Sequence, residues 1–484
     1  MHRPIWSSSL VLLCLVACAT PSSSTAPPSA AASTPESSVA NASGSRASEL
    51  RGPWHGAIEV REQKLLIDVV FTEANGAVQG ALDVRQQGLR GLPLEVLRAD
   101  AQGVTLQSAL PTGQAIRFEG TLAPDRITGT FQQGQAKLPF SLARGERVVE
   151  ARPTRGDGYE DLEVSFENGA IHLAGTLTIP SPAAARPPVA ILITGSGPQD
   201  RNEEVFGLRV FELLAQALAR DGIATLRFDD RGVGQSTGDF LAATTADFAT
   251  DVEAAIRFLQ TRTDVDPTRL GLIGHSEGGL IAPMVAVRNP SVAFIVLLAG
   301  PGQPMDALLL SQIDRIGRAE GHPAEQTRRE QEVTSQALAL LRQGKDLSTL
   351  EGALGSLCGE RCTTREATAA FVKSERWQME TPWFRFLSAY DPQPTLRKVR
   401  CPVLALGGNL DTQVPSDLNL PLLRRALAEA KNPSVAVEEI PRMNHVLQAA
   451  KTGAVSEYAT LPKTLEPAVA RRIGAWLHAL PAAR

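Results

Sequence analysis

The stretch that most constrains the fold runs from Arg269 to Gly279 and reads RLGLIGHSEGG. An apolar strand pattern, 270–273, leads into Gly-His-Ser-Glu-Gly, and an apolar helix pattern follows from Leu280. This is a G-x-S-x-G motif between a strand and a helix, in which a sharp turn holds the serine out over the edge of the sheet. The flanking glycines let neighbouring backbone segments approach closely. We therefore expect Ser276 to be a nucleophile.

The first 50 residues are predicted to be a targeting signal and a tether. His2 and Arg3 precede an apolar run that is too short to cross a bilayer. Residues 1–18 end in Leu-Val-Ala-Cys, which resembles the lipobox of bacterial lipoproteins and implies cleavage before Cys18 and lipid on its sulfur. An ordinary signal peptide with an incidental cysteine is the alternative. Residues 19–50 are rich in Ala, Ser, Thr and Pro, so we expect a disordered tether there.

These features predict an exported bacterial lipoprotein that is membrane-anchored, on the periplasmic side of the outer membrane or at the cell surface. The chain is 43% hydrophobic, which provides for a large core, and its net charge of -4 comes from mixed charges along the chain. The chain has no block of basic residues that would indicate a nucleic-acid partner. The lipid anchor is the only membrane contact that we expect. The sequence leaves the oligomeric state open.

Residues 51–145 have the pattern of an all-β domain. Apolar and polar residues alternate in short segments, with turn signals such as Asn75-Gly76 and Pro124-Asp125 between them. About eight half-buried antiparallel strands of this kind predict a small barrel or sandwich. Such a domain either holds a ligand inside the barrel or acts as a spacer. The spacer is favoured because no polar cluster marks an interior site.

The pattern changes after residues 146–160, a charged segment with Gly and Pro that we expect to be a linker. From residue 161, strand and helix patterns alternate. The run 189–193 is continuously apolar, as in a sheet covered on both faces. A later helix is expected to begin at Thr244 or Thr245 as N-cap. The alternation predicts an α/β domain with a mostly parallel sheet and helices on both faces.

Residues 160–484 resemble an α/β-hydrolase, in particular a bacterial branch of serine esterases with a helical cap. Several motifs carry this resemblance and occur in the expected order. They are Ile193–Arg201, Arg227–Ser236, the turn at Ser276, Trp383–Phe386 with Tyr390–Pro392, Gly408–Pro415 and Met443–Val446. The resemblance implies the α/β-hydrolase fold over 161–484, with 303–398 as a helical lid.

A serine nucleophile needs a base, and the chain has seven histidines. Five of them lie in the signal, the barrel, a strand, the insert or the C-terminal helix, and His275 precedes the nucleophile, so its side chain is expected to point away. His445 remains, in a loop after the last strand. Because α/β-hydrolases order the triad Ser, acid, His, the acid is expected between these residues, and Asp411 follows a strand end. The alternative acids are Asp417, Glu438 and Glu439.

The oxyanion of the reaction needs two N–H donors. One is expected from Glu277, which follows the nucleophile. Alignment with the resembling family gives Ser196 as the other, although many relatives carry His-Gly where this chain has Thr194-Gly195. Because of that difference, the residue that donates the second N–H is uncertain by one position along the chain. A cluster of charged residues is expected to form structural ion pairs behind the site, namely Arg227, Asp229 and Arg231.

Within the expected lid, three aromatic residues could line an acyl pocket or pack in the core: Trp383, Phe384 and Phe386. The insert also contains Cys358 and Cys362. Residues four apart on an intact helix are poorly placed for a disulfide, but Gly359 allows a tight loop, and an oxidising compartment favours the bond. A metal site is the weaker alternative because no third ligand is near.

These features predict a serine carboxylesterase that hydrolyses small carboxylic esters through a Ser-His-Asp triad and an acyl-enzyme intermediate. No cofactor and no metal are expected. A serine exopeptidase or amidase on the same triad is the first alternative, since nine glutamates between 303 and 398 could receive a substrate amine or form a solvated face. A binding lipoprotein that uses the β domain is the second alternative.

Overall fold

The chain folds into two compact units, whose described parts are residues 46–145 and 154–480. The computed structural model describes 46–60, 63–74, 77–84, 89–109, 115–134, 136–145, 154–182, 185–359, 362–432 and 434–480. The expected signal peptide, Cys18 and the tether up to residue 45 lie outside these residues. No helix in the described part of the chain is long and apolar enough to cross a bilayer.

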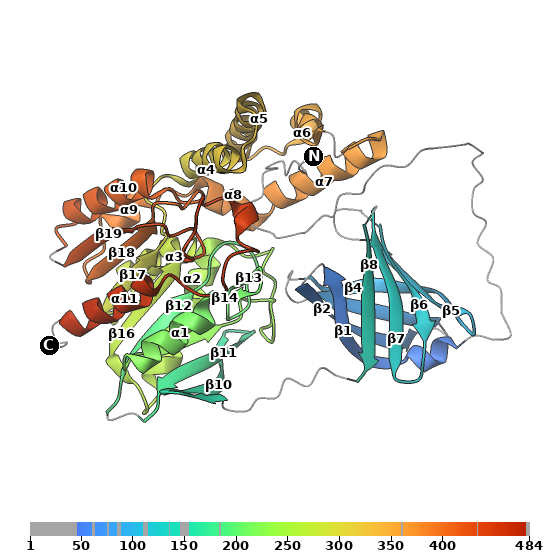
Figure 1. The fold of residues 1–484 in the computed structure, drawn as a ribbon, viewed down its shortest axis with the longest axis horizontal. Helices are drawn as coiled ribbons and strands as arrows, with labels where there is room; N and C mark the ends of the chain where they lie inside the picture. Colours follow the sequence, from blue (N-terminus) through green and yellow to red (C-terminus); the bar gives the residue numbers. More distant parts are fainter. Residues whose placement is uncertain are drawn as a thin grey trace. The chain divides into compact units, whose positions relative to one another are not determined.

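The N-terminal unit is a closed antiparallel barrel in which each strand pairs with the next and β1 pairs with β8 (Figure 1). The strands are β1 (Gly52–Val60), β2 (Gln63–Ala74), β3 (Ala77–Val84), β4 (Leu89–Asp100), β5 (Gly103–Ala109), β6 (Ala115–Leu122), β7 (Arg126–Gln133) and β8 (Ala136–Arg144). Large apolar side chains such as Trp54, Phe71 and Phe118 are buried together as its core. The interior is thus packed by the barrel's own side chains.

Both units begin earlier than their expected boundaries at 51 and 161. A short 3-10 helix, η1 (Ala47–Leu50), precedes the barrel, and Leu50 is fully buried in the barrel core. The Trp54 indole donates a hydrogen bond of 2.6 Å to the Leu50 carbonyl. In the C-terminal unit, β9 (Thr154–Gly156) already pairs with β10. The composition of residues 19–50 did not show that Leu50, at the end of this polar stretch, packs into the barrel core.

The C-terminal unit is built on a nine-stranded sheet with the order β19-β18-β17-β16-β12-β15-β11-β10-β9. Strands β19, β18, β17, β16, β12 and β15 are parallel to their neighbours in this group. The pairs β15–β11, β11–β10 and β10–β9 are antiparallel. Their bounds are β10 (Tyr159–Asn168), β11 (Ile171–Pro180), β12 (Pro188–Ile193), β15 (Ala224–Phe228), β16 (Asp266–His275), β17 (Phe294–Leu298), β18 (Val403–Gly408) and β19 (Val435–Ile440). A two-stranded ribbon, β13 (Glu204–Val205) with β14 (Leu208–Arg209), follows β12.

Helices cover both faces of this sheet, as the continuous apolar run in β12 predicts. Val189 and Ile191 of β12 pack in one core cluster, and Ala190 and Leu192 pack in the other. The first cluster includes residues of α2 (Thr245–Gln260), α3 (Gly278–Arg288) and α10 (Ser416–Glu429), and the second those of α1 (Val210–Arg220) and α11 (Pro467–Ala479). Thr244 is the N-cap of α2, within a capping box with Asp247.

The chain between β17 and β18 forms a helical insert (Figure 1). Its elements are α4 (Met305–Glu320), α5 (Ala324–Arg342), η3 (Ser348–Leu350), α6 (Glu351–Leu357), α7 (Arg365–Met379), α8 (Pro382–Ala389) and α9 (Gln393–Leu396). A last short turn, η5 (Val455–Glu457), precedes α11. The C-terminal unit therefore has the predicted α/β-hydrolase fold, preceded in the chain by the predicted β-barrel domain.

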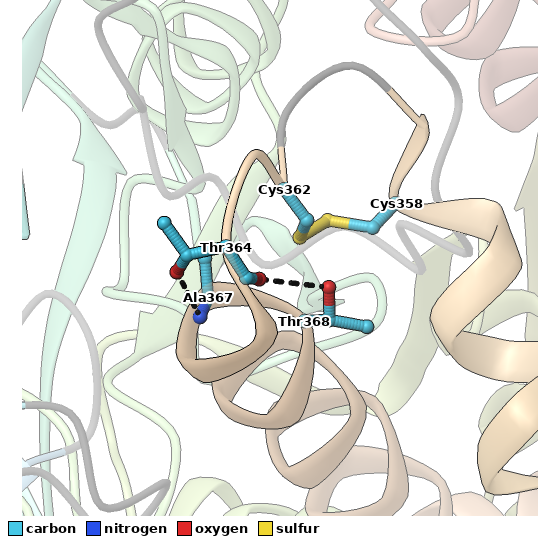
Figure 2. Close-up of a disulfide and its surroundings, with 5 residues drawn as sticks. All are labelled: Cys358, Cys362, Thr364, Ala367 and Thr368. Carbon is cyan, nitrogen blue, oxygen red and sulfur yellow. Dashed lines mark hydrogen bonds between the residues drawn. A yellow bond between two sulfur atoms is a disulfide. The ribbon is translucent and has the colours of Figure 1, made fainter.

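A disulfide joins Cys358 and Cys362 at the connection between α6 and α7 (Figure 2). Helix α6 ends at Leu357, and Gly359 has a φ of +56°, so the two cysteines do not share a helix. Their Cα atoms are 5.7 Å apart, within the range of ordinary disulfides. Just beyond, Thr364 caps α7 by accepting a hydrogen bond from the Ala367 N–H. The bond thus closes the turn that leads into α7.

Candidate active site

Ser276 lies on the turn between β16 and α3, where its φ is +51°. Its N–H donates a hydrogen bond of 2.9 Å to the Leu298 carbonyl of the neighbouring strand. A Cβ on Gly274 would come within 2.0 Å of the Gly278 carbonyl oxygen, and one on Gly278 within 2.2 Å of the Ile193 carbonyl oxygen. Both motif glycines are therefore required by close backbone packing. The serine is held in a left-handed conformation that its side chain disfavours.

His445 and Asp411 meet behind this turn, although they follow different strands. The His445 Nδ1 lies 2.9 Å from the Asp411 Oδ2, and the two residues are 3% and 4% exposed. The other carboxylate oxygen, Oδ1, accepts the N–H groups of Gln413 and Val414, each at 2.8 Å. An ionised carboxylate only accepts, so Nδ1 is the donor in such a pair and Nε2 is left as the acceptor when the ring is neutral. This is the arrangement that a general base requires.

The other candidate acids are engaged elsewhere. Asp417 pairs with Arg315 at 2.6 Å. Glu438 pairs with Arg472 at 2.6 Å, and Glu439 accepts a hydrogen bond of 2.7 Å from the Ser416 hydroxyl. Among the candidates named from the sequence, the structure brings only Asp411 to His445.

Ser276 and His445 line one cavity, with about 600 Å³ of empty volume including its open mouth. Ser196 and Glu277, the two expected oxyanion donors, line the same cavity. The Gly195 N–H donates to the Glu203 carboxylate at 2.7 Å. Gly195 and Ser196 both line the cavity. Because the Gly195 N–H is already bonded to Glu203, the Ser196 N–H is the better candidate for the second oxyanion donor.

The insert reaches this cavity through α4 and not through the three aromatic residues that we considered. Met305, Leu308, Leu309 and Gln312, all on α4, are among the lining residues. Trp383, Phe384 and Phe386 belong to the core cluster or pack against it. The i, i+3, i+4 spacing of the apolar residues on α4 was visible in the sequence. It did not show which element that face would cover.

Trp383 instead contacts the residue that follows the nucleophile. Its indole N–H lies 3.1 and 3.2 Å from the two carboxylate oxygens of Glu277. The Thr245 hydroxyl donates to the same group at 2.7 Å, and the Ser196 hydroxyl also bonds to it. Burial raises the pKa of the Glu277 carboxyl despite these hydrogen bonds. The insert is thereby tied to the residue whose backbone N–H borders the expected oxyanion position.

The expectation that the His275 side chain points away from the site is wrong. The His275 ring lines the cavity, and its centroid lies 4.9 Å from that of the His445 ring. Its Nδ1 lies 2.8 Å from Glu203 and its Nε2 lies 2.8 Å from the His445 carbonyl oxygen. Side chains alternate along a regular strand, but the left-handed backbone at Ser276 ends that alternation. Nothing in the sequence pattern pointed to Glu203.

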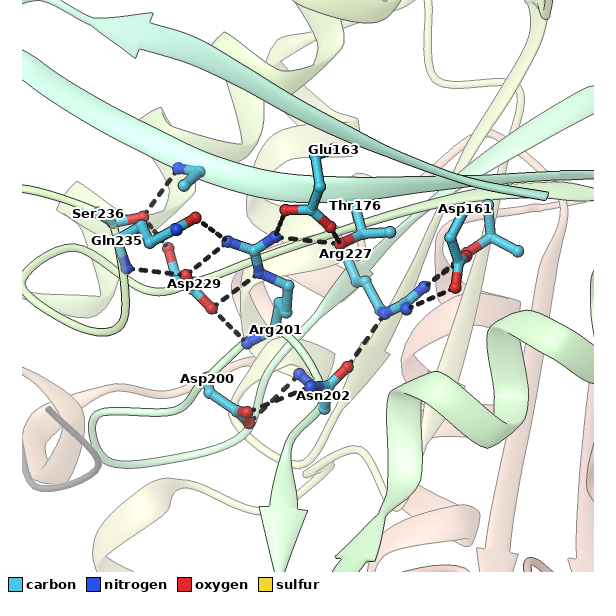
Figure 3. A network of polar contacts seen from close by, with 12 residues as sticks. Asp161, Glu163, Thr176, Asp200, Arg201, Asn202, Arg227, Asp229, Gln235 and Ser236 are labelled. Carbon is cyan, nitrogen blue, oxygen red and sulfur yellow. Dashed lines mark hydrogen bonds and ion pairs between the residues drawn. The ribbon is translucent and has the colours of Figure 1, made fainter. Parts of the chain in front are cut away.

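The charged cluster near this loop forms ion pairs (Figure 3). Asp229 pairs with Arg201 at 2.8 Å, Arg227 pairs with Asp161 at 3.4 Å, and Arg231 pairs with Asp251 at 2.8 Å. Arg201 also reaches Glu163 on β10 at 2.6 Å. None of Arg227, Asp229 and Arg231 is among the residues that line the cavity of Ser276. The two pairs of Arg201 fasten the loop after β12 to the sheet.

A part of the chain is similar to known hydrolases. Residues 208–351, which include Ser276 but not Asp411 or His445, match the family model described as serine aminopeptidase, S33. Esterase EstD of Thermotoga maritima is 28% identical over 157 residues, 32% of this chain and 36% of that protein. Thiohydrolase apmlB of Arthrinium phaeospermum is 34% identical over 113 residues, 21% of this chain and 36% of that protein. The chain thus spans about a third of the length of these curated relatives.

Solved structures give weaker similarities. Est1E from Butyrivibrio proteoclasticus is 16% identical with a TM-score of 0.36, and covers 59% of this chain and 90% of that chain. A proline iminopeptidase from Mycobacterium smegmatis is 18% identical with a TM-score of 0.39, and covers 65% of this chain and 97% of that chain. At such scores these structures carry no argument about function.

Proposed function

We propose that this protein is a serine carboxylesterase that hydrolyses small carboxylic esters. The observation that carries the proposal is the convergence of Ser276, on its strained turn, with the buried His445–Asp411 pair at one cavity. The partial similarity to an esterase supports it. The proposed lid is the helical insert, whose helix α4 contributes an apolar wall to the cavity.

In the proposed mechanism, the His445 Nε2 takes the Ser276 proton as the serine attacks the ester carbonyl. The Glu277 and Ser196 N–H groups stabilise the oxyanion. His445 returns the proton to the leaving alcohol, and an acyl-enzyme remains. Water, activated by the same histidine, then releases the acid. Asp411 fixes the ring tautomer and balances the imidazolium charge during both steps.

An aminopeptidase on the same triad is the second candidate, because the matching family model carries that description. Recognition of a substrate ammonium requires an uncommitted carboxylate facing the cavity. The described lining has two carboxylates, Glu203 and Glu277. Glu277 and the Glu203 Oε1 are held by buried partners, whereas the Glu203 Oε2 is buried without a hydrogen-bond partner among the described residues. The lining residues from α4 carry no charge, and this apolar wall favours the ester over the amine substrate. A binding role for the barrel has less support, because its core is packed.

Ester and amide substrates separate the two candidates. The purified protein should hydrolyse p-nitrophenyl esters, with kcat/KM highest for short acyl chains and lower toward laurate. Each buried methylene contributes about 0.8 kcal/mol, or about fourfold in kcat/KM, only until the cavity is full. Aminoacyl p-nitroanilides should react more slowly than short esters. Faster cleavage of the anilides would establish the aminopeptidase instead, and a preference for emulsified long-chain lipids would refute a preference for small esters.

A matched pair of variants on α4 tests the acyl pocket itself. Leu309→Ala should shift the preferred acyl chain to greater length, since Leu309 lines the cavity. Leu310→Ala makes the same change one residue along the helix, at a position that is not among the lining residues, and should leave the preference unchanged. Buried leucine truncations cost about 2–5 kcal/mol of unfolding free energy, so assays belong well below the melting temperature.

We also propose that the protein is exported and anchored through lipid on Cys18. The support is the Leu15–Cys18 sequence after a short apolar segment. Cys18→Ser should abolish metabolic labelling with a palmitate analogue and leave the protein unprocessed or free of the membrane fraction. Cys14→Ser, in the same apolar segment, is the matched control and should be labelled normally. A processed Cys18→Ser protein that still fractionates with membranes would show that the lipid is not its anchor.

A further inference from the structure

Glu203 is a second buried carboxylate beside the proposed catalytic groups. It is 2% exposed and lines the same cavity. One oxygen, Oε1, accepts both the Gly195 N–H at 2.7 Å and the His275 Nδ1 at 2.8 Å. Gly195 immediately precedes Ser196, a proposed oxyanion donor. The carboxylate therefore joins the loop after β12 to the end of β16.

His275 carries this connection on to the base. Its ring lies between two acceptors, the Glu203 carboxylate on Nδ1 and the His445 backbone carbonyl on Nε2, each at 2.8 Å. A neutral imidazole has one N–H and satisfies only one of them, whereas an imidazolium satisfies both. An imidazolium opposite a carboxylate satisfies both contacts, and burial of such a pair without both hydrogen bonds would be costly.

The electrostatic surroundings agree with this assignment. Burial alone lowers the pKa of His275, but Glu203, its hydrogen bonds and the more distant Asp411 together raise the pKa above its ordinary value. The groups that face the ring come from three loops: Glu203 before β13, Asp411 after β18, and His445 after β19. Because the folded-state pKa is raised, the stabilisation is present at low pH and is lost as pH rises through that value.

The backbone at Glu203 also departs from ordinary geometry. Its φ is +48°, a left-handed conformation that costs free energy for a residue with a side chain. The Glu203 N–H donates to the Asp200 carbonyl at 2.9 Å, which closes a tight turn. Arg201, in the same turn, is fastened to Asp229. The turn is held so that its carboxylate reaches inward to the site.

We propose that Glu203 and His275 form a buried positioning pair that fixes the oxyanion loop and the catalytic histidine relative to each other. The inference rests on the proposed hydrolytic function. Neither residue exchanges a proton with the substrate. Glu203 fixes the Gly195–Ser196 backbone, and the charged His275 holds the His445 main chain. The His445 Nε2 and the oxyanion donors therefore keep a fixed separation across the cavity.

Kinetics of two substitutions at Glu203 test the positioning. Glu203→Ala should lower kcat for a short ester about 100-fold, the scale of a misplacement of about 1 Å. KM should change little, because the substrate does not bind to the buried carboxylate. Glu203→Gln keeps an acceptor oxygen without the charge and should restore part of kcat. The same substitutions at exposed Glu204 are the matched controls and should retain wild-type kcat. A Glu203→Ala enzyme with wild-type kcat would overturn the proposal.

Nitrogen NMR of histidine-labelled protein tests the charge without requiring turnover. The His275 ring, identified by its loss in His275→Asn, should show mainly the shifts of a doubly protonated imidazolium at pH 6.5, the ordinary pKa of a histidine ring. In Glu203→Gln and Glu203→Ala it should become neutral at that pH. A singly protonated His275 in the wild-type protein would refute the pair. Failure of the protein to hydrolyse esters, with the NMR result as expected, would refute the proposed function and leave the pair standing.

Discussion

Ser276→Ala should lower kcat for short esters by about four to six orders of magnitude, as removal of a nucleophile does in other triads. The fold should be retained, because the substitution removes only a hydroxyl and keeps the backbone N–H that donates to Leu298. The measurements are turnover of a short p-nitrophenyl ester and thermal unfolding followed by circular dichroism. A variant that had simply unfolded would lose both its turnover and its cooperative thermal unfolding transition.

A fluorophosphonate probe makes the same test chemically. It should label the wild-type protein at Ser276, located by peptide mass spectrometry, and should not label Ser276→Ala. Ser291→Ala, just after the end of α3, is a matched control whose labelling and turnover should equal those of the wild type. Labelling that persists in Ser276→Ala would show that another residue is the nucleophile.

His445→Ala should cost about as much as loss of the serine, because triad members act as a unit. Asp411→Asn should keep the packing but lower kcat about 10⁴-fold, since an amide can favour the wrong ring tautomer. The reason is the geometry at Nδ1, which is held by Asp411 at 2.9 Å and leaves Nε2 for the serine proton.

The control for His445 is His172→Ala, a partly exposed histidine that pairs with Glu167 at 2.8 Å. Its kcat should equal that of the wild type. In a functioning triad the effects of single substitutions on kcat do not add, because the residues act as a unit. Ser276→Ala combined with His445→Ala should therefore be no slower than Ser276→Ala alone. Retention of substantial turnover in His445→Ala would remove that histidine from the mechanism.

Besides the cavity wall formed by α4, the insert contacts the site through the buried carboxyl of Glu277. Glu277 supplies a proposed oxyanion donor with its backbone and binds Trp383 of α8 with its side chain. Movement of α8 would therefore disturb a buried carboxyl that has no solvent to replace the lost hydrogen bond. The insert therefore contacts both the turn that carries Ser276 and the wall of the cavity.

The sequence by itself determined the features that depend on neighbours along the chain. Period-two alternation specified the barrel strands, and the continuous run 189–193 specified a sheet covered on both faces. The motif around Ser276 specified the turn, because only glycines tolerate the backbone contacts at positions 274 and 278. The fixed chain order of α/β-hydrolase triads then favoured His445 as the base and Asp411 as the acid, with Asp417, Glu438 and Glu439 as alternatives. The structure brings Asp411 to His445.

Only the tertiary structure decided the contacts between distant segments. Glu203 and His275 are 72 positions apart, Glu277 and Trp383 are 106 apart, and His275 meets the His445 carbonyl across 170. Local patterns carry no information on such pairs, because packing of whole elements sets them. The direction of the His275 side chain was predicted wrongly for a further reason. Strand alternation predicts side-chain direction only while the backbone is extended, and the backbone becomes left-handed at Ser276. The sequence therefore could not predict the groups that contact the proposed catalytic residues from distant segments.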